Sequence, residues 1–215
     1  FDVQREYYVN DAGRQMDILT VSVWLRYLEL CGDSPYFPAN GYQGDYIWDI
    51  AAAIHRENGD TYRVGPDELK SDLPDDEPKG GDKEVFIDAI IGRSKSLIGQ
   101  PAFRAIFDVT LELIRADIER DLEAFGVVFQ RWFSELSLVE TNALADSVKL
   151  LQDAGHIYED AGALWFRSTD FGDEKDRVVI RENGVGTYFA SDIAYHLNKF
   201  SRGFDRVINV WGSDH

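Results

Sequence analysis

The sequence predicts an α/β fold, and three observations support this. The opening residues contain a short β-rich run followed by a helical pattern, the closing residues run strand, helix, strand, and the middle is dominated by helical periodicity. Strands that alternate with helices are typical of a parallel sheet. We therefore expect one parallel sheet, formed by the two ends of the chain and interrupted by a largely helical insertion.

The first predicted elements are a strand over Val3–Val9, a turn at Asn10–Gly13 and a helix over Arg14–Leu30, whose apolar residues recur at helical spacing. Gly32 and Pro35 are expected to end this helix, because glycine favours the conformation that closes a helix and proline cannot continue one.

The middle of the chain carries further helical periodicity, separated by one polar segment. Ser71–Asp82 combines charge, proline and glycine with almost no apolar content, which predicts a loop or mobile linker. The expected helices are Asp45–His55, Glu84–Ile98, a continuation from after Pro101 to Ala124, and Val139–Ala154.

The remaining elements are mostly strands. Phe125–Phe133 is apolar and β-branched enough for a strand, and a hairpin is expected around Asp160-Ala161-Gly162. The hairpin strands are His156–Tyr158 and Ala163–Phe166, and the closing elements are a strand at Arg177–Arg181, a helix at Tyr188–Phe200 and a buried strand at Arg206–Val210.

Composition excludes several classes of protein. A net charge of -17 argues against a self-sufficient nucleic-acid binder, because binding phosphates requires clustered Lys and Arg. The single cysteine, Cys31, excludes an internal disulfide framework and indicates a reducing compartment, with a core thiol as the simplest interpretation. No apolar run approaches the roughly 20 residues that span a bilayer. The first residues do not resemble a secretory signal, and a chain that opens on Phe1 is expected to lack its beginning.

The closing helix has two faces. Phe189, Ile193, Leu197 and Phe200 should form an apolar face, whereas Tyr188, Asp192 and Tyr195 group on another. A carboxylate one turn from a tyrosine suits a planar cation, because the acid bonds a guanidinium in a fork while the ring lies against it. The alternative is a surface acid beside a tyrosine that seals the core.

Other candidate residues follow predicted strands. Ligands of such sheets gather beyond the carboxyl ends of the strands, which puts Asn10-Asp11 and Gly212-Ser213-Asp214 on the functional side. Glu135 comes directly after a hydrophobic run and could face a cleft or simply be solvated. Gly212-Ser213-Asp214-His215 could let the backbone approach a nucleotide, or form an ordinary glycine turn. Asn10-Asp11 could cap the next helix or line the site.

Several chemistries have no support in the sequence. The four histidines are widely separated and show no paired metal-ligand spacing, so we expect no metal site. A Gly-x-Ser-x-Gly context and a Gly-x-x-x-x-Gly-Lys-Ser/Thr loop are both absent, which argues against a covalent serine mechanism and a P-loop.

Five segments, taken in order, resemble bacterial arginyl-tRNA synthetases, and the likeness covers essentially the whole chain. The run Tyr-Phe-Ala-Ser-Asp-Ile-Ala-Tyr-His is highly specific to that family. The segments are Arg5–Gly13, Gly41–Ile47, Trp132–Glu135, Thr187–His196 and Val210–His215.

The resemblance implies a partial Rossmann-type class I synthetase catalytic domain with a largely helical connective insertion. Residues 1–33 and 180–215 would belong to the catalytic domain and residues 34–179 to the insertion. It also implies the reaction, in which arginine and ATP give arginyl-adenylate and pyrophosphate, and the arginyl group then passes to tRNA(Arg). ATP would be a substrate, with Mg²⁺ expected for the parent enzyme and no tightly bound cofactor. A cytoplasmic monomer is expected.

The resemblance also implies roles for single residues. Asp192 and Glu135 would bind the guanidinium of arginine, Tyr188 would pack against the arginine side chain, and Asn10 would line the same site. The adenosine of ATP would lie against Gly212, Asp214 and His215. Ser213 stands where we expect alanine, a small change that leaves the backbone geometry intact.

Two departures from the family limit what the chain should do alone. The His-x-Gly-His and Lys-Met-Ser-Lys signatures, which hold the ATP phosphates, are absent, as is the anticodon-binding domain. We therefore assign no catalytic residue and expect the isolated chain to be inactive although its parent is a ligase.

One rival is a non-catalytic arginine-binding or protein-interaction module. The other, a different class I synthetase or nucleotidyl transferase, leaves Tyr188 and Asp192 without a cationic ligand.

Overall fold

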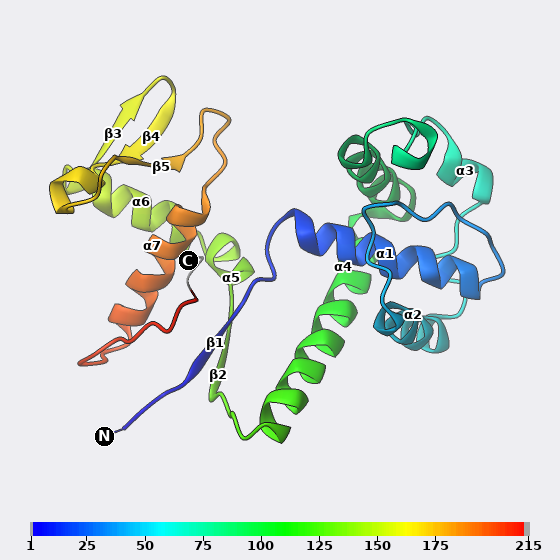
Figure 1. Ribbon diagram of the computed structural model, residues 1–215, viewed down its shortest axis with the longest axis horizontal. Helices are drawn as coiled ribbons and strands as arrows, with labels where there is room; N and C mark the ends of the chain where they lie inside the picture. Colours follow the sequence, from blue (N-terminus) through cyan, green and yellow to red (C-terminus); the bar gives the residue numbers. More distant parts are fainter. Residues whose placement is uncertain (1, 213–215) are drawn as a thin grey trace. The chain divides into compact units, whose positions relative to one another are not determined.

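The computed structural model describes residues 2–212 and divides into two compact units. Unit 1 comprises residues 1–5 and 11–130, and unit 2 comprises residues 6–10 and 131–215. The fold is mixed α/β, as expected, but mostly helical with small sheets (Figure 1). Within residues 2–212, no helix combines the length and apolar character that crossing a bilayer needs.

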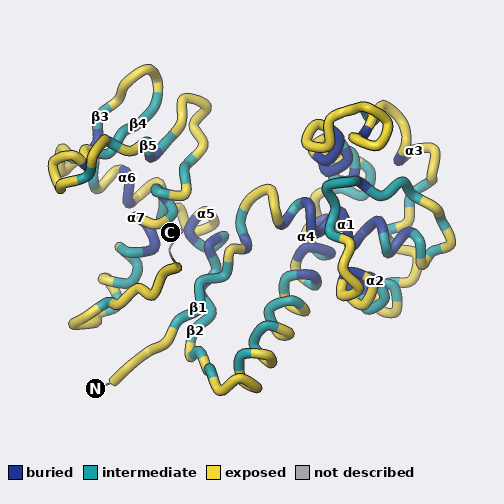
Figure 2. The backbone as a smooth tube through the Cα atoms, viewed as in Figure 1, coloured by how far each residue is buried: buried dark blue, intermediate teal, exposed yellow. Residues whose placement is uncertain are grey.

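Unit 1 is helical and is organised around its first helix. Trp24 and Tyr27 of this helix are fully buried, and the helix packs against the second and fourth helices (Figure 2). The elements are α1 (Arg14–Leu30), α2 (Asp45–Asn58), α3 (Pro66–Lys70), η1 (Glu77–Lys79) and α4 (Lys83–Ala124).

The predicted bounds of α1 are confirmed, and the signal that ends the helix explains why. Gly32 has a φ of 91° and donates its N–H to the carbonyl of Glu29 at 3.0 Å, while Asp33 donates to Leu28 at 3.0 Å. This pair of bonds closes the last turn around a left-handed residue, which glycine adopts without strain. Cys31, expected in the core, is only partly buried at this helix end.

The helix α4 is bent at Gly99, where the sequence predicted a break between two helices. Gly99 has φ 79° and ψ 156°, values outside the helical region. Pro101 follows it and has no N–H to continue the ladder of hydrogen bonds. The kink therefore has an identified cause in the residues themselves.

The polar segment 71–82, predicted as a loop or mobile linker, is irregular apart from η1 and is anchored at its centre. Asp76 is 1% exposed, and its Oδ2 accepts hydrogen bonds from the Tyr36 hydroxyl at 3.0 Å and the Ala39 N–H at 2.8 Å. Its Oδ1 accepts from the N–H of Glu77 at 2.8 Å and so caps η1. One buried acid fixes a segment that composition alone marks as loose.

We expect Asp76→Ala to lower the free energy of unfolding by about 1 to 3 kcal/mol, because three partly buried hydrogen bonds would lose their acceptor. Urea denaturation would measure the change. Asp75→Ala is the matched control, since the neighbouring Asp75 is exposed. Equal effects of the two substitutions would show that Asp76 does not anchor the segment.

The part of unit 2 that the structure describes contains two separate sheets, so the prediction of one parallel sheet joining both ends of the chain is wrong. A parallel pair, β1 with β2, aligns Glu6 with Arg131 and Val9 with Ser134. The other sheet is antiparallel with the order β3-β4-β5. The elements are β1 (Glu6–Val9), β2 (Arg131–Ser134), α5 (Leu136–Glu140), α6 (Ala143–Asp153), β3 (Ile157–Asp160), β4 (Ala163–Phe166), η2 (Ser168–Phe171), β5 (Arg177–Ile180) and α7 (Tyr188–Ser201).

The antiparallel sheet confirms the predicted hairpin. Ala161 and Gly162 connect β3 to β4 with φ values of 49° and 78°, both left-handed, which matches the twist of a two-residue hairpin turn. Helices α6 and α7 pack on this sheet (Figure 1), burying Val148, Ile157, Val179 and Ala190 in one cluster.

Three other predicted elements differ from the structure. The helix expected over Val139–Ala154 is two helices, α5 and α6, separated at Asn142, whose φ of 60° breaks the ladder. Residues 125–130 form a turn and irregular backbone, and only the end of the strand expected at Phe125–Phe133 is present, as β2.

The buried strand expected at Arg206–Val210 is also wrong. This segment is irregular, with Ile208 76% and Val210 94% exposed (Figure 2). A strand needs a neighbour that exchanges backbone hydrogen bonds with it, and no strand within residues 2–212 pairs with this segment. The apolar composition predicted burial but could not provide a partner.

The two units are defined by which residues pack together. Their boundaries differ from those of the predicted domains, 1–33, 34–179 and 180–215. That division describes the domains of the resembled family and stays a prediction.

Candidate functional site

The carboxylate of Glu6 connects β1 to α7 and β2 in unit 2. Its side chain is 10% exposed, and it accepts hydrogen bonds from the Tyr195 hydroxyl at 2.6 Å and from Arg202 Nη1 at 2.5 Å and Nη2 at 3.0 Å. Arg131 Nε of β2 lies 3.1 Å from the same carboxylate. Tyr195 also packs its ring on Tyr8 and Phe133, with centroids 4.7 and 4.5 Å away. One acid therefore sets how α7 lies on the parallel pair.

The surroundings of Glu6 favour its charged form. Burial alone would raise the pKa of this carboxyl, but the hydrogen bonds from Arg202 and Tyr195 and the charges of Arg202 and Arg131 together outweigh burial and lower it. The pKa of Tyr195 is raised, first by burial and then by the hydrogen bond to Glu6 and the charge of that carboxylate. The tyrosine is therefore a neutral donor to an ionised acid.

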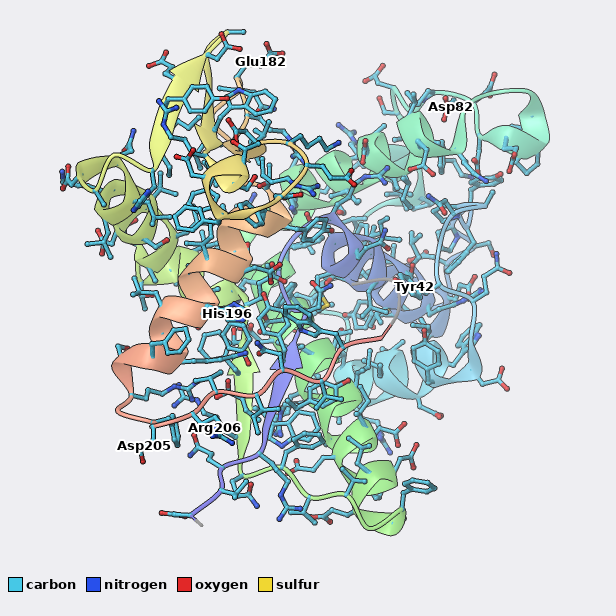
Figure 3. The ribbon with its side chains drawn as sticks, turned by 60° about the vertical axis from the view of Figure 1, so that its left-hand side comes forward. Tyr42, Asp82, Glu182, His196, Asp205 and Arg206 are labelled. Carbon is cyan, nitrogen blue, oxygen red and sulfur yellow. The ribbon has the colours of Figure 1, made fainter. Side chains whose placement is uncertain are left out.

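We expect Glu6→Gln to destabilise unit 2 by about 3 kcal/mol, the lower end of the range for removing one partner of a buried ion pair, because Arg131 stays partly exposed. Chemical denaturation followed by circular dichroism would measure the loss. Glu182→Gln is the control, since Glu182 is exposed (Figure 3). A loss no larger than that of the control would contradict the structural role of Glu6.

The stability difference between Glu6→Gln and the unchanged chain should depend on pH. Because the folded-state pKa of Glu6 is lowered, its contribution is complete above the unfolded-state value of about 4.3 and is lost as the pH falls through the folded value. In denaturation curves at stepped pH, the stability difference should therefore begin to shrink below about pH 4.3 and should vanish only below the lower folded-state pKa. A difference that persists unchanged in acid would exclude ionisation of Glu6 as its source.

The parallel pairing of β1 and β2 brings two predicted site residues to the same edge. Asn10 follows β1 and Glu135 follows β2, and the Glu135 N–H donates to the carbonyl of Val9 at 3.1 Å. In a parallel pair the carboxyl ends of both strands meet at one edge, where ligands gather. Asn10 is exposed and Glu135 is 6% exposed. Gly13 is the N-cap residue of α1, so neither Asn10 nor Asp11 occupies the N-cap position.

The hydroxyl of Tyr8 connects the two predicted guanidinium-binding acids. Its pKa is raised by burial and then by the negative charges of Glu135 and Asp192, and the hydroxyl is hydrogen-bonded to the Glu135 side chain. Tyr8 lies in β1, beside the strand that precedes Glu135, and its ring packs on Tyr195 of α7 at 4.7 Å between centroids. The helix that carries Asp192 and the strand that precedes Glu135 thus both lie against Tyr8. Sequence reasoning overlooked Tyr8, although it lies two residues before Asn10.

The N-terminal turn of α7 displays two further predicted residues. Thr187 is the N-cap, as predicted, and its Oγ accepts from the N–H of Ala190 at 3.4 Å. Tyr188 is 75% exposed and Asp192 is exposed one turn later. The predicted grouping of Tyr195 with these two is wrong, because Tyr195 is 7% exposed and faces the core. Leu197 and Phe200, expected on the apolar face, are 41% and 61% exposed.

The segment after α7 folds back along this helix (Figure 3). Asn209 Nδ2 lies 3.0 Å from His196 Nε2, and Asn209 Oδ1 accepts from Lys199 Nζ at 2.6 Å. The other ring nitrogen of His196, Nδ1, lies 2.8 Å from the carbonyl of Asp192. These partners fit a neutral ring protonated on Nδ1, with Nε2 accepting from Asn209.

This returning segment carries the residues predicted to bind the nucleotide. Trp211 is 62% exposed, with its ring edge-on to His196 at 6.1 Å between centroids. Gly212 is exposed at the end of the segment. Asp214 and His215 lie outside the described residues.

A hollow of about 590 Å³ is present in unit 1. Its lining includes Tyr46 and Ile50 of α2 and Leu113 of α4. None of the predicted site residues lines it, so it gives no support to the predicted roles.

Known proteins were compared with the whole chain. The arginine–tRNA ligase of Thioalkalivibrio sulfidiphilus is 60% identical over 215 residues, and that of Legionella pneumophila is 57% identical. The chain covers 37% and 36% of their lengths. A solved structure of a putative arginyl-tRNA synthetase from Campylobacter jejuni matches with a TM-score of 0.73 at 30% identity, covering 99% of this chain and 39% of that one. No protein-family model matches the sequence.

Identity of this level along all 215 residues, together with a shared three-dimensional arrangement, establishes common descent. The chain is therefore a homologue of arginine–tRNA ligases that spans about 37% of the length of the curated relatives it matches.

Proposed function

We propose that this chain supplies the arginine-binding part of an arginine–tRNA ligase, within a Rossmann-type class I catalytic domain whose connective insertion runs from 34 to 179. The observation that carries the proposal is the parallel pairing of β1 and β2, which puts Asn10 and Glu135 at one edge, with Tyr8 of β1 packed on Tyr195 of α7, the helix that carries Asp192. Glu135 and Asp192 would together form an electronegative site that suits a cation. The exposed ring of Tyr188 is free to cover that cation.

The chemistry of these groups favours a guanidinium over an ammonium. A guanidinium is planar and presents forked donors that two carboxylates can accept together, whereas an ammonium is a point charge. The raised pKa of Tyr8 keeps its hydroxyl neutral, so that it hydrogen-bonds Glu135 without adding charge. The Tyr188 ring would stack on the guanidinium plane, and Asn10 would supply a polar side chain at the same edge.

The same proposal places the nucleotide at the end of the returning segment. Gly212, Asp214 and His215 would bind the adenosine of ATP, with Mg²⁺ accompanying the phosphates. The reaction would join arginine to AMP, release pyrophosphate and pass the arginyl group to tRNA(Arg) in the cytoplasm. A net charge of -17 supports the view that other parts of the enzyme, which we propose to be monomeric, supply most of the RNA contact.

Arginine binding to this chain should depend on Asp192. We expect Asp192→Asn to weaken the affinity by about 2 to 5 kcal/mol, the range for truncating one partner of a buried charged pair. The lower end is expected because Asp192 is exposed in the free chain. Isothermal titration calorimetry with arginine would measure the change.

The controls for this titration are one variant and two ligands. Asp160→Asn removes an exposed charge from the β3–β4 hairpin and should leave the affinity unchanged. Citrulline, which is neutral, should bind far more weakly than arginine because the acids would be left unpaired, and lysine should bind less well. Equal affinity of the Asp192→Asn variant and the unchanged chain would remove Asp192 from the site.

A further inference from the structure

Unit 1 contains a group of ligand-type side chains that shares no residue with the proposed arginine site. One ligand atom each from Cys31, His55 and Asp60 lies within 4.8 Å of the others. Cys31 follows the last turn of α1, His55 is in the last turn of α2, and Asp60 follows the glycine that ends α2. The helices α1 and α2 pack on each other (Figure 1), so this grouping belongs to the fold of the unit.

We propose that Cys31, His55 and Asp60 form a binding site for a divalent cation of the Zn²⁺ class. A thiolate, an imidazole and a carboxylate are the ligands that Zn²⁺ takes, in tetrahedral sets. Its bond lengths of about 2.0 to 2.3 Å separate neighbouring ligand atoms by about 3.3 to 3.6 Å. The three atoms therefore need to close by about 1 Å, within the reach of side-chain rotation.

The loop that carries Asp60 is held in position by buried residues of α1. The Tyr27 hydroxyl donates to the carbonyl of Gly59 at 2.5 Å and accepts from the N–H of Tyr62 at 3.0 Å. Trp24 Nε1 donates to the carbonyl of Tyr62 at 2.9 Å. Because Trp24 and Tyr27 are both fully buried, the ligand-bearing loop is ordered before any cation binds. Preorganisation of this kind lowers the cost of binding.

Arg63, which could compete with a cation for Asp60, forms its shorter hydrogen bonds with Asp33. Arg63 lies 3.8 Å from Asp60, but its Nε and Nη2 each bond Asp33 at 2.9 Å. Asp60 keeps a side chain that is 62% exposed, and His55 Nε2 lies 3.7 Å from it. The carboxylate can turn toward a cation without breaking the bidentate pair, and the exposed side leaves a fourth coordination position to water.

Titration of the full 215-residue chain with Co²⁺, a spectroscopic substitute for Zn²⁺, tests this site. We expect one Co²⁺ per chain and a near-ultraviolet charge-transfer absorption, which requires a cobalt–thiolate bond. Cys31→Ser should abolish that absorption. His55→Ala and Asp60→Asn should each weaken Co²⁺ and Zn²⁺ binding by more than tenfold, since loss of a supporting residue around a metal already costs about 10- to 100-fold.

The control is His156→Ala, which removes a histidine of unit 2 and should leave the cation affinity unchanged. Circular dichroism of each variant separates loss of binding from loss of fold, and Asp60→Asn is the isosteric variant for this purpose. Absence of the thiolate absorption in the unchanged chain would overturn the proposal. Weakening by His156→Ala equal to that by His55→Ala would do so as well.

Discussion

The structure of unit 2 depends on one buried carboxylate, that of Glu6. Strands β1 and β2 are four residues each, and α7 packs on them through Tyr195, which contacts Tyr8 and Phe133. Glu6 adds a polar connection by accepting from Tyr195 of the helix and from Arg202 at its C-terminal end while it pairs with Arg131 of the neighbouring strand. Burying an acid is unfavourable unless it is paired and hydrogen-bonded, and here both conditions are met. This connection joins α7, which carries Asp192, to β2, the strand that precedes Glu135.

Local structure was predictable from the sequence because its causes are local. The bounds of α1 follow from apolar spacing and from Gly32, the β3–β4 hairpin follows from Ala161-Gly162, and the start of α7 follows from Thr187. Pairing between distant segments was not predictable in the same way. The tail at 206–210 has the composition of a buried strand, but composition does not identify the partner that a strand requires. The same limit explains why one sheet was expected where two exist.

The candidate site shows a similar division. The rule that ligands gather beyond the carboxyl ends of strands pointed to Asn10-Asp11 and Gly212-Ser213-Asp214, and Glu135 was singled out because it follows a hydrophobic strand. The pairing of β1 with β2 places Asn10 and Glu135 at one edge. Helical spacing alone grouped Tyr195 with Tyr188 and Asp192. The spacing shows on which face of the helix a residue lies, but not which other elements pack against that face. The cluster of Cys31, His55 and Asp60 was missed for the same reason, since residues 24 and 5 positions apart share no periodic pattern. The roles in arginine binding came from the family resemblance.

The kink in α4 has a stereochemical consequence. A methyl group built on Gly99 would find only Pro101 Cδ, at 3.8 Å, so space is not what selects glycine there. Its φ of 79° is the cause, because L-residues are strained in that region and their mirror images are not. The backbone conformation at residue 99 is therefore restricted by the chirality of the residue and not by the volume of its side chain. A chemically synthesised chain carrying D-alanine at residue 99 would keep the bend, whereas the L-enantiomer would oppose it.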